Sequence, residues 1–176
     1  MSKENNANPA LELIKDVSKG EDKVLTLPGN IQVMVMPVSA TLLDEVTSRI
    51  VDPEPPMFYN EQKDREEPNP LDPSFIKELQ ANERKRQVAI MDVMTMFGVV
   101  LMNGMPEDDG WVKKLQMMEK LGHLDLSGYD FDDELDMEFV YKRFIVLSAS
   151  LIGKIGSASG LSEEEVAKAE TSFQSN

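Results

Sequence analysis

The feature that most constrains this chain is a cluster of prolines in its middle. Residues 52–73 hold six of the ten prolines in the sequence. Proline lacks a backbone N–H and fixes φ, so a regular helix or a central strand does not run through such a stretch. The same residues include seven Asp and Glu against Lys63 and Arg65, which favours an extended, solvated backbone. The sequence therefore predicts an acidic, proline-rich linker over residues 52–73.

Before the linker, the sequence changes character at about residue 23. Residues 1–22 are mostly polar and predict a flexible N-terminal arm. Residues 23–51 begin with two short runs rich in β-branched residues around a Pro-Gly-Asn turn, and this pattern predicts a β-hairpin. Apolar residues at helical spacing follow and predict a short helix up to about Ile50. The second strand is apolar on both faces near its end, so we expect something else to cover it.

After the linker, residues 74–156 predict a helical core of about three to four helices. A long helix is expected from Ser74 to about Met102, where Asn103 and Gly104 would stop it. Further helices are expected over residues 111–121 and 135–152, each with apolar residues on one side. Residues 157–176 predict a C-terminal tail with one short helix that has little apolar surface with which to dock. The chain is thus expected to be mainly α with a small N-terminal β-hairpin, in the α+β class.

The amino-acid composition excludes most kinds of active site. The chain has no Cys, which excludes disulfides, thiolate nucleophiles and zinc ribbons, and its one His leaves little for histidine-based chemistry. The acidic residues between 125 and 138 do not fit the ligand spacing of a calcium-binding loop, and they suit a solvated loop at the start of a helix better. We therefore expect no enzyme activity, no cofactor and no metal site.

The charge of the chain limits its partners. Lys and Arg number 18 and Asp and Glu number 32, which gives a formal net charge of −14. Binding to nucleic acid or to an anionic membrane needs clustered Lys and Arg, so neither partner is expected. No apolar run reaches the roughly 20 residues that a membrane span requires, and the polar start lacks the pattern of a secretory signal. The sequence predicts a soluble intracellular protein.

Methionine is unusually frequent, with twelve residues, of which seven lie between residues 91 and 118. Methionine side chains pack adaptably and are common at surfaces that accept varied partners. One interpretation is a methionine-rich core, and the other is an exposed groove for an amphipathic segment of a partner. Three large side chains within the linker suggest an anchor onto the domain or onto a partner. The candidate partner-binding residues are Met91, Met94, Phe97, Met102, Met105, Trp111, Met117, Met118, Met57, Phe58 and Tyr59.

The order of these segments resembles a known family. The hairpin sequence LTLPGNIQVMVMPV is followed by a short helix and a PEPP stretch, and then by EEPNPLDPSF before the long helix. The chain then continues with GMPEDDGW and LDLSGYDFDDELDMEFVYKRF. In order and composition, residues 24–147 resemble the small tail assembly chaperones of long-tailed, siphovirus-like bacteriophages. The resemblance implies a non-enzymatic protein of the infected host cytoplasm. It would bind the helix-rich tape measure protein and assist assembly of the tail tube.

Two other functions remain open at this point. A structural virion component of the head–tail or tail region would share the same composition. An acidic mimic of nucleic acid, which inhibits a DNA-binding protein, would account for the negative charge. Mimicry requires carboxylates on rigid elements, whereas many acidic residues here lie in the linker and in predicted loops. The expected partners are therefore the tape measure protein and, second, the tail tube protein, and a homo-oligomer is also compatible with the sequence.

Overall fold

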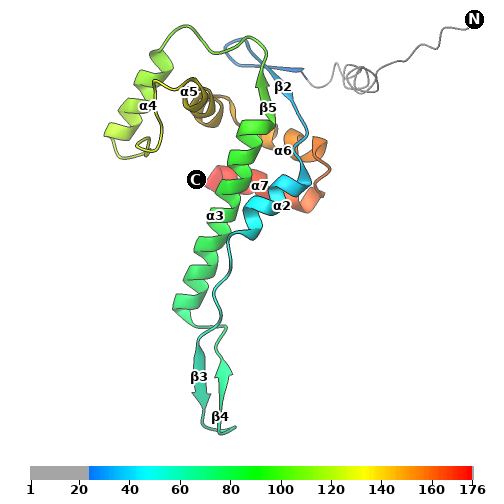
Figure 1. Cartoon of the computed structure of the whole chain (residues 1–176), viewed down its shortest axis with the longest axis vertical. Helices are drawn as coiled ribbons and strands as arrows, with labels where there is room; N and C mark the ends of the chain where they lie inside the picture. Colours follow the sequence, from blue (N-terminus) through cyan, green and yellow to red (C-terminus); the bar gives the residue numbers. More distant parts are fainter. Residues whose placement is uncertain (1–23, 176) are drawn as a thin grey trace, which may run out of the picture.

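The computed structural model describes residues 24–175. This part of the chain is rich in helix and carries small antiparallel sheets, in agreement with a mainly α chain that includes some strands. The longest element, α3 (Pro73–Phe97), runs along the long axis of the molecule (Figure 1). The side chain of Asp72 caps α3, because it accepts hydrogen bonds from the backbone N–H groups of Ser74 and Phe75. The arm expected at residues 1–22 lies outside the described residues.

Three strands form a sheet at one end of the molecule. Strands β1 (Val24–Leu27) and β2 (Ile31–Val35) pair antiparallel, and β5 (Val99–Leu101) pairs antiparallel on the other side of β2. Between β1 and β2, Gly29 and Asn30 have φ values of 81° and 62°, a region that these two residue types tolerate best. Alternate residues of β2 face the core, so one face of the sheet is buried.

The long helix is shorter than predicted, because its expected last residues form strand β5. Helix α3 ends at Phe97, not near Met102, and the chain turns at Gly98 directly into the strand. The backbone N–H of Met36 donates a hydrogen bond of 3.0 Å to the carbonyl of Gly98, and Val99 pairs with Val35. As a strand, residues 99–101 pair with the backbone of β2, and the side chain of Val99 is buried. β-Branched residues favour such an extended backbone.

The predicted linker contains a second hairpin. Strands β3 (Met57–Asn60) and β4 (Arg65–Pro68) pair antiparallel and project beyond the start of α3 (Figure 1). Glu67 lies at the centre of a polar network, with Lys63 at 2.9 Å, Arg65 at 2.6 Å and Asn60 at 3.0 Å. These charged and polar contacts hold together a segment whose composition alone suggested an extended linker.

The chain on the N-terminal side of this hairpin is fastened to α3. A guanidinium nitrogen of Arg86 donates hydrogen bonds to the carbonyl of Ile50 at 2.8 Å and to the carboxylate of Asp52 at 2.6 Å. Asn82 donates to the carbonyl of Val51 at 2.9 Å. Because Arg86 also faces Glu83 on its own helix, this basic residue of α3 belongs to an ion-paired surface.

Helices α2 and α4 follow the sequence pattern closely. Helix α2 (Ala40–Ser48) packs against α3 and buries Leu43. Helix α4 (Gly110–Lys120) ends just before Gly122, which has a φ of 75°. The N–H of His123 then reaches back to the carbonyl of Met118 at 3.0 Å, a common way to close a helix.

The single helix predicted over residues 135–152 is broken into three parts. Helix α5 (Glu134–Tyr141) continues into the π-helical turn η2 (Lys142–Val146), and α6 (Ala149–Ala158) follows after an extended break. Ser148 begins α6, because its hydroxyl accepts a hydrogen bond from the N–H of Leu151 at 3.3 Å. The capping serine therefore determines where α6 begins, and Gly153 and Gly156 lie inside this helix without interrupting it.

The C-terminal helix α7 (Glu163–Ser175) docks on the body of the molecule, contrary to the small apolar surface expected of it. It packs against α6 and α3. A Cβ atom at Gly156 of α6 would lie 2.9 Å from Cγ2 of Val166, so the glycine permits this close approach. Leu161 and Ala169 also pack against the core. Small residues on α6 thus compensate for the few apolar residues on α7.

One hydrophobic core joins the parts of the chain on both sides of the linker. Val33 of β2, Met94 of α3, Val140 of α5 and Ile155 of α6 are each completely buried in it. Residues 23–51 and 74–156, which the sequence suggested as successive units, therefore share a single core. None of the helices within residues 24–175 combines the length and the apolar character needed to cross a membrane.

Candidate protein-binding surface

Burial divides the candidate residues into two groups. Met91, Met94 and Trp111 belong to the hydrophobic core, and Met94 has no exposed surface at all. Met105 is half-buried and packs against the same core. For Met91, Met94 and Trp111, the expectation of an exposed contact surface is therefore wrong, because helix packing uses these side chains internally. The exposed members are Phe97, Met102, Met117, Met118, Met57, Phe58 and Tyr59.

The outer face of α4 carries one exposed apolar stripe. Trp111, Val112 and Leu115 face inward, whereas Met117 and Met118 face solvent with 55% and 41% of their surface exposed. Leu121, which the sequence pattern had not singled out, extends the exposed stripe by one turn. Its spacing of four residues from Met117 could have identified it.

Ring packing fixes the inner face of α4. The rings of Trp111 and Tyr141 meet edge to face, with centroids 5.0 Å apart and an interplanar angle of 66°. This contact joins α4 to the end of α5 and keeps the inner side of α4 occupied. Burial also raises the pKa of the Tyr141 hydroxyl. The outer stripe is consequently held in a fixed orientation.

A second exposed apolar area covers the outer face of the three-stranded sheet. Val24, Met34 and Val100 lie side by side across β1, β2 and β5, because each pairs with the next in the strand register. Met102 lies one step further along, with its N–H bonded to the carbonyl of Gln32 at 2.8 Å. Among the described residues, Val24, Val100 and Met102 remain exposed. The sequence indicated this face through the double-sided apolar character of β2, but not the role of β5.

The hairpin of β3 and β4 presents a third exposed area. Met57 and Tyr59 lie on one face of the hairpin and Phe58 on the other, since alternate strand residues point to opposite sides. All three are between 43% and 56% exposed. A hydrogen bond to Asp64 raises the pKa of the Tyr59 hydroxyl. A two-stranded hairpin is marginal by itself in water, so large apolar side chains on both faces are unusual without a covering partner.

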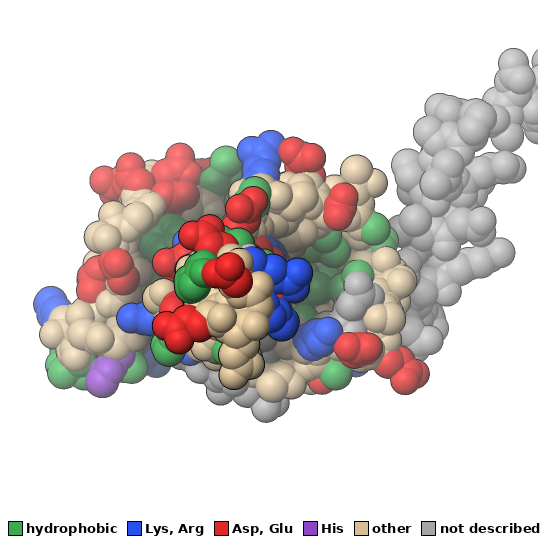
Figure 2. Space-filling model, turned by 90° about the horizontal axis from the view of Figure 1, so that it is seen from below, with side chains coloured by type: hydrophobic (Ala, Val, Ile, Leu, Met, Phe, Trp, Pro, Cys, Tyr) green, Lys and Arg blue, Asp and Glu red, His purple; other side chains and the backbone are tan. Residues whose placement is uncertain are grey.

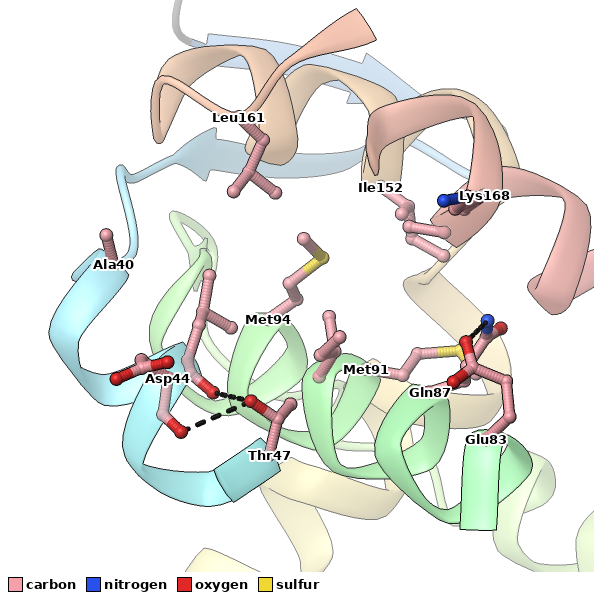
Figure 3. A pocket seen from close by; sticks show the side chains of 13 residues that line it. Ala40, Asp44, Thr47, Glu83, Gln87, Met91, Met94, Ile152, Leu161 and Lys168 are labelled. Atoms are coloured by element: carbon pink, nitrogen blue, oxygen red, sulfur yellow. Dashed lines mark hydrogen bonds between the residues drawn. The ribbon is translucent and has the colours of Figure 1, made fainter. Parts of the chain in front are cut away.

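A pocket of about 300 Å³ lies between α2, α3, α6 and α7 (Figure 3). Met94 and Leu161 point into the space from opposite sides, and Ile152 closes it from α6. Around its mouth stand Asp44, Glu83 and Lys168, all exposed. The lining residues are Ala40, Leu43, Asp44, Thr47, Glu83, Gln87, Ile90, Met91, Met94, Ile152, Leu161, Lys168 and Ala169.

The acidic residues between 125 and 138 have structural roles, as expected of a loop that starts a helix. Asp133 caps α5 by accepting hydrogen bonds from the N–H groups of Leu135 and Asp136. A hydrogen bond from the Ser127 hydroxyl lowers the pKa of Asp125. Within residues 24–175, no group of three or more Asp, Glu and His side chains is arranged to hold a metal ion.

One partly buried ion pair stands apart from this loop. Arg143 of η2 lies 3.6 Å from the carboxylate of Asp92 on α3. Burial raises the pKa of Asp92, and the charge of Arg143 opposes that rise. The Nη1 atom of Arg143 is buried and has no hydrogen-bond partner among the described residues. The pair links the π-helical turn to the long helix across the core.

Seen from the hairpin end, acidic side chains are spread over the body, and hydrophobic side chains are exposed between them (Figure 2). The chain thus combines strong negative charge with several separate apolar areas. No family model, no curated protein and no solved structure matches this chain.

Proposed function

We propose that this chain is a non-enzymatic chaperone of bacteriophage tail assembly. In this role it binds the tape measure protein in the cytoplasm of the infected host, keeps it soluble and assists formation of the tail tube. The tail tube protein is the second partner. The proposal joins the resemblance of residues 24–147 to tail assembly chaperones with the physical character of the surface.

The observation that carries the proposal is the exposure of large, adaptable apolar side chains on three elements. Met117 on α4, Met102 after β5 and Met57 on β3 each leave about half of their surface in solvent. Apolar patches on soluble proteins are typical of sites that contact other proteins. Methionine suits a partner with varied apolar sequence, because its flexible side chain adapts to different shapes.

The net charge of −14 supports the same role. A chaperone that holds an apolar chain must keep the complex dispersed, and like charges on separate complexes repel one another. On the face seen in Figure 2, acidic side chains alternate with hydrophobic side chains that remain exposed. A structural virion component would use similar contacts, but it would remain bound in the finished particle.

Co-expression with the tape measure protein of the same genome tests the proposal. We expect the tape measure protein to become soluble and to co-purify with this chain. Purified particles should contain no fixed number of copies of this chain. Failure of both solubility and co-purification would exclude the chaperone role, and a constant stoichiometry in the particle would favour the virion component.

A further inference from the structure

We propose that the pocket between α2, α3, α6 and α7 is an anchor site for a cationic amphipathic helix. It receives one large apolar side chain of that helix, and Lys or Arg residues that flank this side chain face the acidic mouth of the pocket. The inference rests on the proposed protein-binding function and specifies the chemistry of the partner.

The interior of the pocket suits an apolar side chain. Leu43, Met91, Met94 and Ile152 form buried walls, so the base of the pocket offers almost only carbon and sulfur atoms. The hydroxyl of Thr47 donates to the carbonyls of Leu43 and Asp44 and is not directed at a ligand. At about 300 Å³ the pocket is at the small end of ligand sites, which span roughly 300–1,000 Å³. This size suits a single anchoring side chain better than an extended lipid.

The mouth of the pocket determines the charge of the partner. Asp44 of α2 stands on one side of the pocket, and Glu83 of α3 and Lys168 of α7 stand on the opposite side (Figure 3). Lys168 already pairs with Glu164 at 2.9 Å, and Glu83 lies 3.5 Å from Arg86. Among the lining residues, two carboxylates stand against the single cationic group of Lys168, and Lys168 and the nearby Arg86 are both already paired with carboxylates. The charge of −14 on the whole chain acts in the same direction, so a cationic partner is attracted both locally and at long range.

Small side chains keep the pocket open. Ala40 at the start of α2 and Ala169 on α7 line the pocket from different elements. The contact of Val166 with Gly156 holds α7, and therefore Ala169, close to α6. A larger side chain at either alanine would occupy the space without changing the charge of the protein. These two positions thus separate anchoring by the pocket from attraction by charge.

The test measures binding of a labelled 18-residue peptide to the full chain by fluorescence anisotropy in 0.15 M salt. The probe is a helix of leucines spaced at i, i+3, i+4 and i+7, with lysine at the remaining positions. Two comparison peptides replace leucine by alanine or lysine by glutamate. We expect Ala40→Phe and Ala169→Leu each to weaken binding of the leucine–lysine peptide about tenfold or more, as loss of a buried anchor does. Thr41→Phe, at an exposed neighbouring position outside the pocket, should bind like the wild type.

Charge reversal gives the second part of the test. Asp44→Lys combined with Glu83→Lys should weaken the same peptide while leaving the far-ultraviolet circular dichroism spectrum unchanged. Equal binding of the lysine and glutamate peptides, or unchanged binding by both pocket-filling variants, would overturn the inference. A dimer that Ala40→Phe dissociates would also overturn it, since the occupant would then be a second copy. If the tape measure protein co-purifies equally with the wild type and the filled variants, the chaperone role stands and the anchor site fails.

Discussion

Gly156 and Val166 are in such close contact that a Cβ atom at residue 156 would lie 2.9 Å from Cγ2 of Val166. The distance is shorter than ordinary van der Waals contact, so only glycine fits there without a shift of α7. The residues that line the pocket from α7 depend on this contact. Packing of α7 is therefore as important to the pocket as the apolar residues of α3.

Replacing Gly156 by leucine should displace α7. We expect the free energy of unfolding to fall by about 1–3 kcal/mol, the usual cost of overpacking. Hydrogen exchange should accelerate first in residues 163–171 and leave α3 protected. Gly128, where an added Cβ atom would have no heavy atom within 4 Å, is the control, and its replacement by alanine should change stability by less than about 0.5 kcal/mol. Unchanged exchange in α7 would contradict the prediction.

Met94 and Met117 should respond differently to truncation, although the sequence placed both in one group. Met94→Ala removes a completely buried side chain and should cost about 2–5 kcal/mol in unfolding free energy. Met117→Ala changes a side chain that is 55% exposed and should cost less than about 0.5 kcal/mol. Urea denaturation of the two variants measures both values. Similar losses for the two would contradict the division into core and surface.

The edge-to-face contact of Trp111 and Tyr141 should be detectable as an energetic coupling. A double-mutant cycle with Trp111→Leu and Tyr141→Leu is expected to give about 0.5–1.5 kcal/mol of interaction energy, as aromatic pairs do. A second cycle combines Trp111→Leu with Phe75→Leu. Phe75 lies at the start of α3, away from the ring pair, so the two losses of unfolding free energy should be additive. Additivity in both cycles would mean that the rings only fill space.

The carboxyl of Asp92 should titrate above 3.8, the ordinary value for aspartate, because burial disfavours its charged form. Arg143→Gln should raise the pKa further, since the guanidinium favours the ionised carboxylate. The folded state binds this proton more tightly than the unfolded state does. The contribution of Asp92 to stability is therefore present at low pH and is lost as pH rises through its pKa.

Carbon-13 NMR of the carboxyl group measures the titration directly. Chemical denaturation across the same pH range measures the linked loss of stability, and Asp92→Asn should remove that dependence. A value at or below 3.8 would contradict the assigned effect of burial.

The hairpin face of Met57 and Tyr59 should contribute to partner binding. Replacing both residues by serine is expected to reduce the amount of tape measure protein that co-purifies, with little change in thermal unfolding, because both side chains are exposed. Val51→Ser is a matched control, since Val51 is also highly exposed but lies outside the hairpin. Equal co-purification by the wild type and both variants would show that the hairpin is not a contact site.

The start of α3 and the end of α4 could be predicted from the sequence because local residues determine them. Asp72 before Pro73 begins α3, and Gly122 ends α4 through its positive φ. The strand β5 could not be predicted in the same way. Residues 99–101 continue the apolar pattern of α3, and only pairing with residues 33–35, far away in the sequence, makes them a strand. Non-local hydrogen bonds overrode the local helical pattern there.

The candidate surface was only partly predictable for a similar reason. The sequence identified the side-chain chemistry of Met94 and Met117, but which side of each helix meets a neighbour depends on how several elements pack together. The pocket depends on α7, whose docking follows from glycines in another helix. The hairpin of residues 57–68 depends on the ionic network around Glu67, which composition alone does not reveal.

The length of α3 has a consequence for the kind of chain that can be held. At about 1.5 Å per residue, the 25 residues of α3 span about 37 Å, and the hairpin of β3 and β4 lies beyond the start of this helix (Figure 1). A ligand that contacts both the hairpin and Phe97 at the end of α3 would have to extend over at least this length, which corresponds to about 25 residues of continuous helix. If the proposed partner contacts both ends of α3, the length of this helix favours long helical segments over short peptides.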